Sequence, residues 1–299
     1  MKKILLSGVS GFVGSNLSKY LIDLNYFIGA INLKTKVDNR IIEDYDVFIH
    51  LAGKAHDVKD VSDPTEYYLI NTDLTNSFFD AFLHSTASTF IYFSSVKASA
   101  DDVTGILLET DIPNPKTHYG KSKLMAEEYI LSKKIPESKR VYILRPCMIH
   151  GPGNKGNLNL LFHWVKKGYP WPLGSFDNQR SFCSIENVSF VVNELLSRTD
   201  IPSGIYNLSD NDTLSTNQLI KLIGQALDRD VKIWRVNQDW VRFLISLGDR
   251  FKLPLNSERL HKLTSGYVVS NEKLLSALGK PLPVNAQIGM MHTLTNFTN

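Results

Sequence analysis

Apolar and polar positions follow two different periods along the first half of the chain. Short, nearly continuous apolar runs predict buried strands, whereas an apolar residue every three to four positions predicts an amphipathic helix. The expected strands cover residues 2–7, 26–32, 46–52, 90–94 and 140–146, and the expected helices cover residues 14–25, 63–84 and 120–133. Because strand and helix alternate throughout, we predict an α/β fold whose parallel sheet carries helices on both faces.

The pattern changes after about Gly151. A turn-rich segment is followed by shorter helical patterns, which cover residues 158–167, 216–228, 240–249 and 271–278. Loops that contain proline and glycine separate these patterns. Short helices joined by such loops predict a second, smaller and mainly helical lobe.

Composition narrows the class of protein. The chain has 299 residues, enough for two packed lobes, and 43% of them are apolar, as in an ordinary globular protein. Its formal net charge of +3 gives no reason to expect a nucleic acid or an anionic membrane as a partner. The two cysteines, Cys147 and Cys183, have no metal-ligand spacing, which indicates a reducing compartment and no metal site. The chain shows neither a signal peptide nor a membrane-spanning run, so we expect a soluble cytoplasmic protein.

Three glycines join the first expected strand to the first expected helix. Gly8, Gly11 and Gly14 are spaced three residues apart within the first fifteen residues. Glycines at such a junction allow a tight turn and let a pyrophosphate approach the positive end of the helix. Their position between a strand and a helix predicts a dinucleotide-binding turn rather than a structural one.

A second candidate for chemistry is the pair formed by Tyr119 and Lys123. The two residues lie four positions apart at the start of a helical pattern, so their polar tips can share one site. A free phenol has a pKa of about 10, and a neighbouring ammonium would lower that pKa and favour the phenolate. The pair therefore predicts a device for proton transfer.

Further landmarks follow in chain order. They are His50-Leu51-Ala52-Gly53, Ser95, the pair Tyr119 and Lys123, Arg145-Pro146 and Gly151-Pro152-Gly153. From Met1 to about Pro283 the chain resembles the extended short-chain dehydrogenase/reductase family, in its nucleotide-sugar epimerase/dehydratase branch. The resemblance implies a Rossmann-type, doubly wound sheet that binds NAD or NADP, and a C-terminal lobe that holds a nucleotide diphosphate sugar, with UDP as the expected nucleotide.

The resemblance also implies a division of the chain and an assembly. Residues 1–150 and a returning segment at about 183–208 would form the NAD(P)-binding domain. Residues 151–182 and 209–299 would form the substrate-binding lobe. Two helices of each subunit would pair in a homodimer.

The family resemblance assigns roles to three catalytic residues. Tyr119 would exchange a proton with a sugar oxygen at C4, and Lys123 would hold the nicotinamide ribose and lower the pKa of the tyrosine. Ser95 would hydrogen-bond the same sugar oxygen, with Ser94 as the alternative. The family's Val-Tyr-Gly stretch is replaced here by residues 98–100, Ala-Ser-Ala, which alters the expected sugar contacts.

The same resemblance implies a set of residues around the cofactor. These are Gly8, Ser10, Gly11, Phe12, Val13, Gly14, Asn32, Lys34, Leu51, Ala52 and Gly53, together with Tyr119 and Lys123. NAD-preferring members carry an acid where this chain has Asn32, and Lys34, Lys36 and Arg40 follow. Loss of the acid removes repulsion against a 2′-phosphate, so NAD and NADP both remain open.

On the substrate side, the matching positions are Ser95, His56, Asn157, Trp171, Leu173, Arg180 and Arg259. The planar guanidinium of arginine suits a diphosphate, which favours Arg180 more strongly than Arg259. Trp171 and Leu173 fit a contact with the base and a place in the core equally well, and His56 fits a ligand or a surface residue. His50 is expected to be a core histidine, and Asn71 to brace the central strands.

One departure from the family pattern narrows the reaction. Dehydratases of this branch place Asp-Glu after the catalytic hydroxyl residue, whereas Val96 and Lys97 follow Ser95 here. The favoured reaction is therefore epimerisation at C4 of a UDP-hexose or UDP-N-acetylhexosamine. The alternatives are an NADPH-dependent reductase of a nucleotide-linked 4-keto-6-deoxy sugar and, more distantly, a dehydrogenase of a non-nucleotide ketone. A protein that only senses its cofactor is disfavoured because Tyr119, Lys123 and Ser95 are all present.

Overall fold

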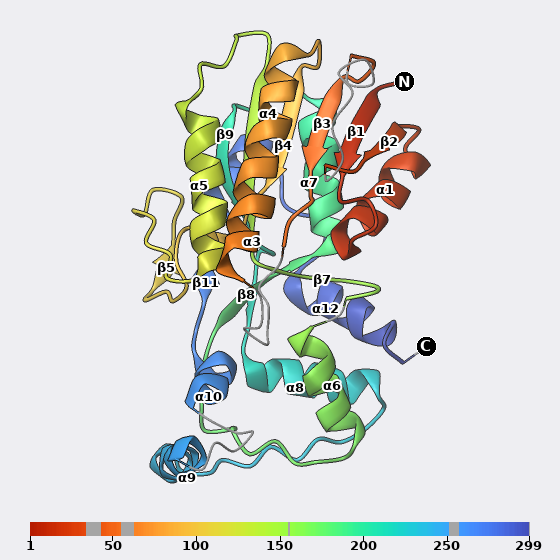
Figure 1. Cartoon of the computed structure of the whole chain (residues 1–299). Helices are drawn as coiled ribbons and strands as arrows, with labels where there is room; N and C mark the ends of the chain where they lie inside the picture. The colour runs from red at the N-terminus through yellow and green to blue at the C-terminus, as the bar shows by residue number, and fades with distance from the viewer. Residues whose placement is uncertain (34–42, 55–62, 155, 251–256, 299) are drawn as a thin grey trace.

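A parallel sheet forms the centre of the larger lobe (Figure 1). The computed structural model describes residues 1–33, 43–54, 63–154, 156–250 and 257–298. Within these ranges six strands run parallel in the order β2-β1-β3-β4-β6-β9. Their bounds are β1 Lys3–Ser7, β2 Phe27–Ile31, β3 Val47–His50, β4 Thr89–Phe93, β6 Arg140–Pro146 and β9 Gly204–Leu208. The order reverses direction between β1 and β3, which is where ligands bind in doubly wound sheets.

Helices cover both faces of this sheet, as the alternating pattern predicts. On one face, α1 (Phe12–Asp23) packs against α7 (Ile185–Ser197), and their apolar residues join Ile4, Leu6 and Ile49 in one core cluster. On the other face, α4 (Leu74–His84) and α5 (His118–Ser132) form a second cluster with Leu5 and Phe48. Neighbouring strand residues thus point to opposite faces and both faces are buried, which explains the unbroken apolar runs of the sequence.

The segment 183–208 returns the chain to the large lobe after its first passage through the small one. It carries α7 and the edge strand β9, which pairs with β6 from Tyr142↔Gly204 to Pro146↔Leu208. The last strand of the large sheet, β9, therefore comes from residues that follow part of the small lobe along the chain.

The small lobe is mainly helical and lies below the sheet in Figure 1. Its helices are α6 (Asn157–Lys166), α8 (Thr216–Ala226), α9 (Gln238–Arg250), α10 (Ser257–Thr264) and α12 (Ala286–Thr295). A separate core cluster of apolar residues, which includes Phe162, Trp171, Ile220 and Met290, holds the lobe together.

Short strands and one more helix connect the two lobes. In the described residues, β7 (Met148–His150), β8 (Arg180–Ser184) and β10 (Thr213–Leu214) form a small sheet in the order β10-β8-β7. A further pair joins β5 (Ile106–Leu107) to β11 (Val268–Val269), and α11 (Glu272–Leu278) follows. No helix in the described ranges is both long and apolar enough to cross a lipid bilayer.

The helix expected at residues 63–84 is interrupted by a wider turn. It consists of α3 (Pro64–Tyr68), the π-helical turn η1 (Leu69–Asp73) and α4. Within η1, Asn71 and Thr72 turn their side chains toward Ser122 of α5, where they bond to its hydroxyl and its carbonyl. A π turn inserts one residue into a helix, and hydropathy periodicity does not reveal such an insertion.

Candidate active site

The glycine turn between β1 and α1 is closely packed against the loop that follows β3. Gly8 has a φ of 77°, and a Cβ atom there would lie 2.6 Å from the backbone nitrogen of Ala52. A Cβ on Gly14 would overlap the carbonyl oxygen of Gly8. The positions therefore require glycine because a side chain would force the backbone apart.

The positive end of α1 has the features that a pyrophosphate needs. Gly11 is its N-cap, no side chain caps the first amides, and the first turn contains no acidic residue. Those amides and the helix dipole favour an anion, so the turn fits the diphosphate of a dinucleotide. Ser10 is exposed beside Gly11, and Phe12 lies near Gly151 across the site.

Tyr119 and Lys123 both project from the first turns of α5, next to the carboxyl end of β4. Thr117 begins this helix as its N-cap by accepting a bond from the amide of Gly120 at 3.2 Å. The Lys123 side chain is buried, and its Nζ donates to the carbonyl of Phe93 at 2.9 Å. The same Nζ lies 4.9 Å from the centre of the Tyr92 ring.

Two serines that follow β4 lie in different surroundings. Ser94 Oγ donates to the carboxylate of Glu127 in α5. The two oxygens of that carboxylate also accept from Arg145 Nε, at 3.0 and 3.1 Å. Ser95 begins the short helix η2 (Val96–Ala98) and hydrogen-bonds the side chain of Tyr119. Ser94 is therefore part of a buried ionic cluster, whereas Ser95 adjoins the tyrosine.

The electrostatics of the pair differ from the sequence-based expectation. Burial raises the pKa of Tyr119, while the bond from Ser95 lowers it and Tyr67 raises it further. Burial lowers the pKa of Lys123 to about 8, against the opposing effect of Glu127. Desolvation is thus the largest cause of both shifts, and the pKa of Tyr119 is raised rather than lowered in this structure. That Lys123 lowers the tyrosine pKa during the reaction stays a prediction.

The loop after β3 is tied to α5 through Asn71. The Asn71 side chain accepts from the Lys54 amide at 2.8 Å and donates to the Lys54 carbonyl at 3.1 Å. A Cβ on Gly53 would lie 3.2 Å from Lys123 Nζ, so this loop passes directly over the lysine. Leu51 and Ala52 are fixed in turn by bonds of 3.2 and 3.3 Å to Ser7.

His50 lies under this loop as a buried neutral group. Its Nδ1 pairs with Ser7 Oγ at 2.6 Å and its Nε2 with Thr75 Oγ1 at 2.8 Å. Burial, with a smaller contribution from the Lys123 charge, lowers the pKa of His50 to about 3. Both ring nitrogens are engaged, which is the arrangement expected of a core histidine.

The sequence of the chain matches a known protein family. The family model described as "NAD dependent epimerase/dehydratase family" matches residues 4–209, more than half of the chain. The chain belongs to this family.

Individual relatives agree with this assignment. The UDP-glucose 4-epimerase of Vibrio cholerae is 29% identical over 99% of this chain and 95% of its own length. The N-acetyl-alpha-D-glucosaminyl-diphospho-ditrans,octacis-undecaprenol 4-epimerase of Escherichia coli O157:H7 is 28% identical over 76% of this chain and 73% of its own. Reductases, such as a GDP-6-deoxy-D-mannose reductase, also occur among the relatives.

The fold is that of solved epimerases. The crystal structure of UDP-N-acetylglucosamine 4-epimerase from Bacillus cereus superposes with a TM-score of 0.78 over 100% of both chains. Its sequence is 18% identical, so the likeness concerns the fold alone. The parallel order of the central sheet agrees with this superposition.

Arg180 stands at the start of β8. Its guanidinium donates to the carbonyl of Lys262 in α10, and burial lowers its pKa while Tyr267 opposes the shift. The backbones of Arg180 and Tyr267 form a bridge, and the Tyr267 hydroxyl donates to Ala100 at 2.6 Å. Arg180 is thus held between the two lobes with part of its surface exposed.

Lys97 is a further residue at this site to which sequence reasoning gave no role. Its Nζ lies 4.4 Å from the centre of the Tyr267 ring and donates to the Asp101 carbonyl at 2.6 Å. Burial lowers the pKa of Lys97, and the charge of Arg180 lowers it further, against the opposing effects of Asp101 and Asp102. Its place directly after Ser95 and Val96, where the chain departs from the dehydratase pattern, is the signal that could have pointed to it.

The remaining candidates are less closely grouped. Trp171 and Leu173 are buried in the core of the small lobe, where Trp171 Nε1 donates to Asn217 at 3.1 Å. Arg259 is exposed on α10, Asn157 begins α6, and Asn32 is exposed after β2. Lys34, Lys36, Arg40 and His56 lie outside the described residues.

Proposed function

We propose that the protein is an NAD(P)-dependent 4-epimerase of a UDP-linked hexose or N-acetylhexosamine. The observation that carries the proposal is the convergence of Tyr119, Ser95 and Lys123 at the carboxyl end of β4. This group lies beside a glycine turn whose open amides suit a dinucleotide. The Vibrio cholerae relative supports the choice of substrate.

Tyr119 would act on the proton of the sugar hydroxyl at C4. A dinucleotide held by the glycine turn, Gly53 and Lys123 would supply an acceptor and donor of hydride. Tyr119 Oη would take the hydroxyl proton as the carbonyl forms and return it when the alcohol is restored on the other face. Ser95, already bonded to Tyr119, would hold the same sugar oxygen in line for the transfer.

Lys123 would supply positive charge beneath the reacting groups. Its ammonium is buried next to Tyr92 and Gly53, so its field is weakly screened there. Below its pKa of about 8 it would favour a phenolate on Tyr119 once a cationic partner adds to its effect.

Arg180 would anchor the diphosphate of the substrate. A guanidinium offers paired donors to phosphate oxygens, and Arg180 links β8 of the small connecting sheet to α10. Such an anchor recognises the diphosphate itself and not the group, such as a nucleoside, to which the diphosphate links the sugar. The name of the E. coli relative likewise places a diphosphate next to its sugar, with undecaprenol in place of a nucleoside.

Product analysis with purified protein tests the proposal. We expect conversion of UDP-glucose or UDP-N-acetylglucosamine to its 4-epimer without added coenzyme. Tyr119→Phe should lower turnover by about 10²- to 10⁴-fold, the usual contribution of general acid–base catalysis. Tyr68→Phe is the matched control, since Tyr68 bonds His118 on the exposed side of the same helix end. Full activity of Tyr119→Phe would refute the mechanism.

The same assay separates the alternatives. Consumption of added NADPH with a 4-keto-6-deoxy sugar, and no epimerisation, would establish the reductase instead.

Arg180→Met should raise the KM for a UDP-sugar; an unchanged KM would favour a substrate without a diphosphate. We expect the protein in the cytoplasm, and the homodimer that the family resemblance implies predicts twice the subunit mass in light scattering.

A further inference from the structure

Two cations, Lys97 and Arg180, lie on either side of one tyrosine near the catalytic residues. Lys97 belongs to η2, whose N-cap Ser95 bonds Tyr119. Its ammonium lies over the ring of Tyr267, 4.4 Å from the ring centre. Arg180 begins β8, and its backbone forms a bridge with the backbone of Tyr267. Tyr267 therefore brings the two cations into one region of the molecule.

Both cations keep hydrogen-bond donors for a further partner. Lys97 Nζ donates to the Asp101 carbonyl at 2.6 Å, and the Arg180 guanidinium donates to the Lys262 carbonyl. In the part of the chain that the structure describes, neither cation has a second acceptor or forms an ion pair with a carboxylate. An ammonium carries three N–H donors and a guanidinium five, so both groups can bind additional oxygen atoms.

The two positive charges oppose each other while no anion is bound. Both residues are half-buried, and burial lowers the pKa of each. The charge of Arg180 lowers the pKa of Lys97 further, so the two groups are near enough to interact. Like charges repel strongly where little water screens them. An anion beside both groups would offset that repulsion, and perturbed charges of this kind gather at functional sites.

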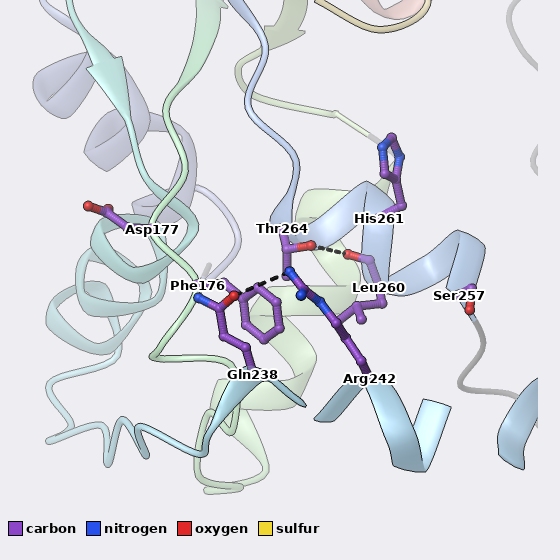
Figure 2. Close-up of a pocket in the computed structure, with 8 residues that line it drawn as sticks. All are labelled: Phe176, Asp177, Gln238, Arg242, Ser257, Leu260, His261 and Thr264. Carbon is purple, nitrogen blue, oxygen red and sulfur yellow. Dashed lines mark hydrogen bonds between the residues drawn. The ribbon is translucent and has the colours of Figure 1, made fainter. Parts of the chain in front are cut away.

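Two nearby aspartates have other partners. Asp101 and Asp102 oppose the fall in the Lys97 pKa, but neither pairs with that lysine within the described ranges. The Asp101 carboxylate accepts from the amide and the hydroxyl of Thr117, each at 3.0 Å. Asp102 lies 3.8 Å from His261, which lines a cavity of about 410 Å³ between α9 and α10 (Figure 2). The charge of Lys97 is therefore only partly offset by the protein itself.

The position of Lys97 suits the middle of the proposed substrate. Ser95 would hold the sugar oxygen at C4, and Arg180 would hold the diphosphate. Lys97 stands two residues after Ser95, and its ammonium is close enough to Arg180 for their charges to interact. A sugar nucleotide that extends from Ser95 to Arg180 would bring its phosphates to the Lys97 ammonium. Each phosphate of a diphosphate is negatively charged, which matches a pair of cations.

We propose that Lys97 and Arg180 form one subsite for the diphosphate of the substrate, which we call the two-cation subsite. The proposal deepens the proposed function and rests on it, because it requires a diphosphate-linked sugar. Both side chains would donate charge-assisted hydrogen bonds to phosphate oxygens. Lys97 and Ser95 belong to the same short turn, so the contacts to the diphosphate and to the C4 oxygen would keep a fixed separation.

Calorimetric titration of the full chain with UDP tests the two-cation subsite. Saturating NAD(P) is present so that the glycine turn is filled. Lys97→Met should weaken UDP binding by about tenfold or more, because a charge-assisted hydrogen bond is lost. Lys97→Arg keeps the charge and should retain most of the affinity. Lys116→Met is the matched control, since it removes an equal charge at an exposed lysine that bonds Asn114, and it should bind UDP normally.

The double variant Lys97→Met/Arg180→Met shows whether the two cations share one ligand. Residues with a shared partner are energetically coupled. The loss of UDP affinity in the double variant should therefore differ from the product of the two single losses by more than about twofold. A loss equal to that product would assign the cations to separate partners and overturn the shared subsite.

Three further results would overturn the proposal. One is an unchanged UDP affinity in Lys97→Met, and another is an equal loss of affinity in Lys116→Met. The third is a loss confined to UDP-glucuronic acid while UDP itself binds normally, which would place Lys97 at a carboxylate of the sugar. The affinity for NAD(P) should be the same in every variant, which shows that the protein remains folded.

The titration with UDP is separate from the assay of turnover. Weaker UDP binding in Lys97→Met, without epimerisation by the unmodified chain, would support the two-cation subsite and refute the proposed reaction. Epimerisation of a UDP-sugar, with unchanged UDP affinity in Lys97→Met, would do the reverse. Failure of the unmodified chain to bind UDP would refute both.

Discussion

At the scale of single residues, burial determines what each polar side chain can do. Ser94 and Ser95 are neighbours in sequence, yet one bonds the Glu127 carboxylate and the other bonds Tyr119. His50 is held neutral between two hydroxyls, although it stands two residues from the backbone that lines the cofactor turn. Similar residue types thus serve either structure or chemistry according to their partners.

Substitution of the two serines should separate these roles. Ser95→Ala removes the hydroxyl next to Tyr119, so we expect turnover to fall about 10- to 100-fold, as for a hydrogen bond to a charged group. Ser94→Ala leaves Glu127 without one donor and should lower the unfolding free energy by about 1–3 kcal/mol with little change in turnover. Steady-state kinetics and thermal unfolding of both variants provide the comparison. A large loss of turnover in Ser94→Ala, with a loss of stability alone in Ser95→Ala, would reverse the roles of the two serines.

His50 should make the protein sensitive to acid. Its pKa is lowered from 6.5 to about 3 on folding, so below pH 6.5 the unfolded state binds more protons than the folded state. The stabilising effect of a neutral His50 is complete above pH 6.5 and is lost as the pH falls toward 3, by about 3 kcal/mol near pH 4.5.

Denaturant unfolding at several pH values measures this contribution. His50→Gln should flatten the loss of stability between roughly pH 6.5 and 4.5. The exposed His84 offers a control, because His84→Gln should retain the slope of the unmodified chain. An identical slope in the His50 variant would show that other groups cause the acid sensitivity.

The sequence indicated the main residues of the site but not their electrostatics. The spacing of Tyr119 and Lys123 suffices to put them on one helical face, since a helical turn takes nearly four residues. Their pKa shifts depend on burial under Gly53 and beside Tyr92, and tertiary contacts decide that burial. A sequence contains no direct measure of desolvation, so it does not show that the pKa of Tyr119 is raised in this structure.

At the scale of elements, backbone turns fix the spacing between the site's parts. The glycine turn touches the loop after β3, and Asn71 in the π turn η1 joins that loop to α5. The glycines could be interpreted from sequence because their spacing between a strand and a helix is specific. The π turn could not, because one inserted residue barely alters the apolar period of residues 63–84.

Gly14→Ala should disrupt the turn. The new Cβ would overlap the carbonyl oxygen of Gly8, and backbone cannot move aside as a flexible side chain can. We expect the affinity for NAD(P) to fall by more than about tenfold, since the amides of α1 are displaced from the diphosphate. Gly156→Ala, where the nearest atom to the new Cβ would be 3.7 Å away, should bind the cofactor normally. Calorimetry measures both; equal affinities would exclude close packing as the reason for glycine.

At the scale of the whole molecule, the two lobes share one chain that passes between them repeatedly. The large lobe's edge strand β9 and its helix α7 come from residues 185–208, after the first helix of the small lobe. Whole-chain averages conceal local features at this scale. The net charge of +3, for example, does not say where along the chain the charged residues lie.

A fragment of residues 1–150 should therefore fail to fold. It lacks β9, and it also lacks the α7 residues Val188, Val191 and Leu195, which cover one face of the sheet and are fully buried. Joining residues 1–150 through a flexible linker to residues 183–210 should restore a cooperative thermal transition in circular dichroism. If the shorter fragment unfolds with the same cooperativity, α7 and β9 are dispensable for the sheet.

The late entry of β9 also limits how such an enzyme can acquire new substrates. A small lobe cannot be exchanged as a single cassette, because its helix α6 precedes, and its helices α8, α9 and α10 follow, the segment that completes the large lobe. Recombination would have to replace two stretches of gene together and preserve the join at both ends of the segment between them. Divergence by point substitution, within an architecture that stays intact, is the simpler evolutionary route.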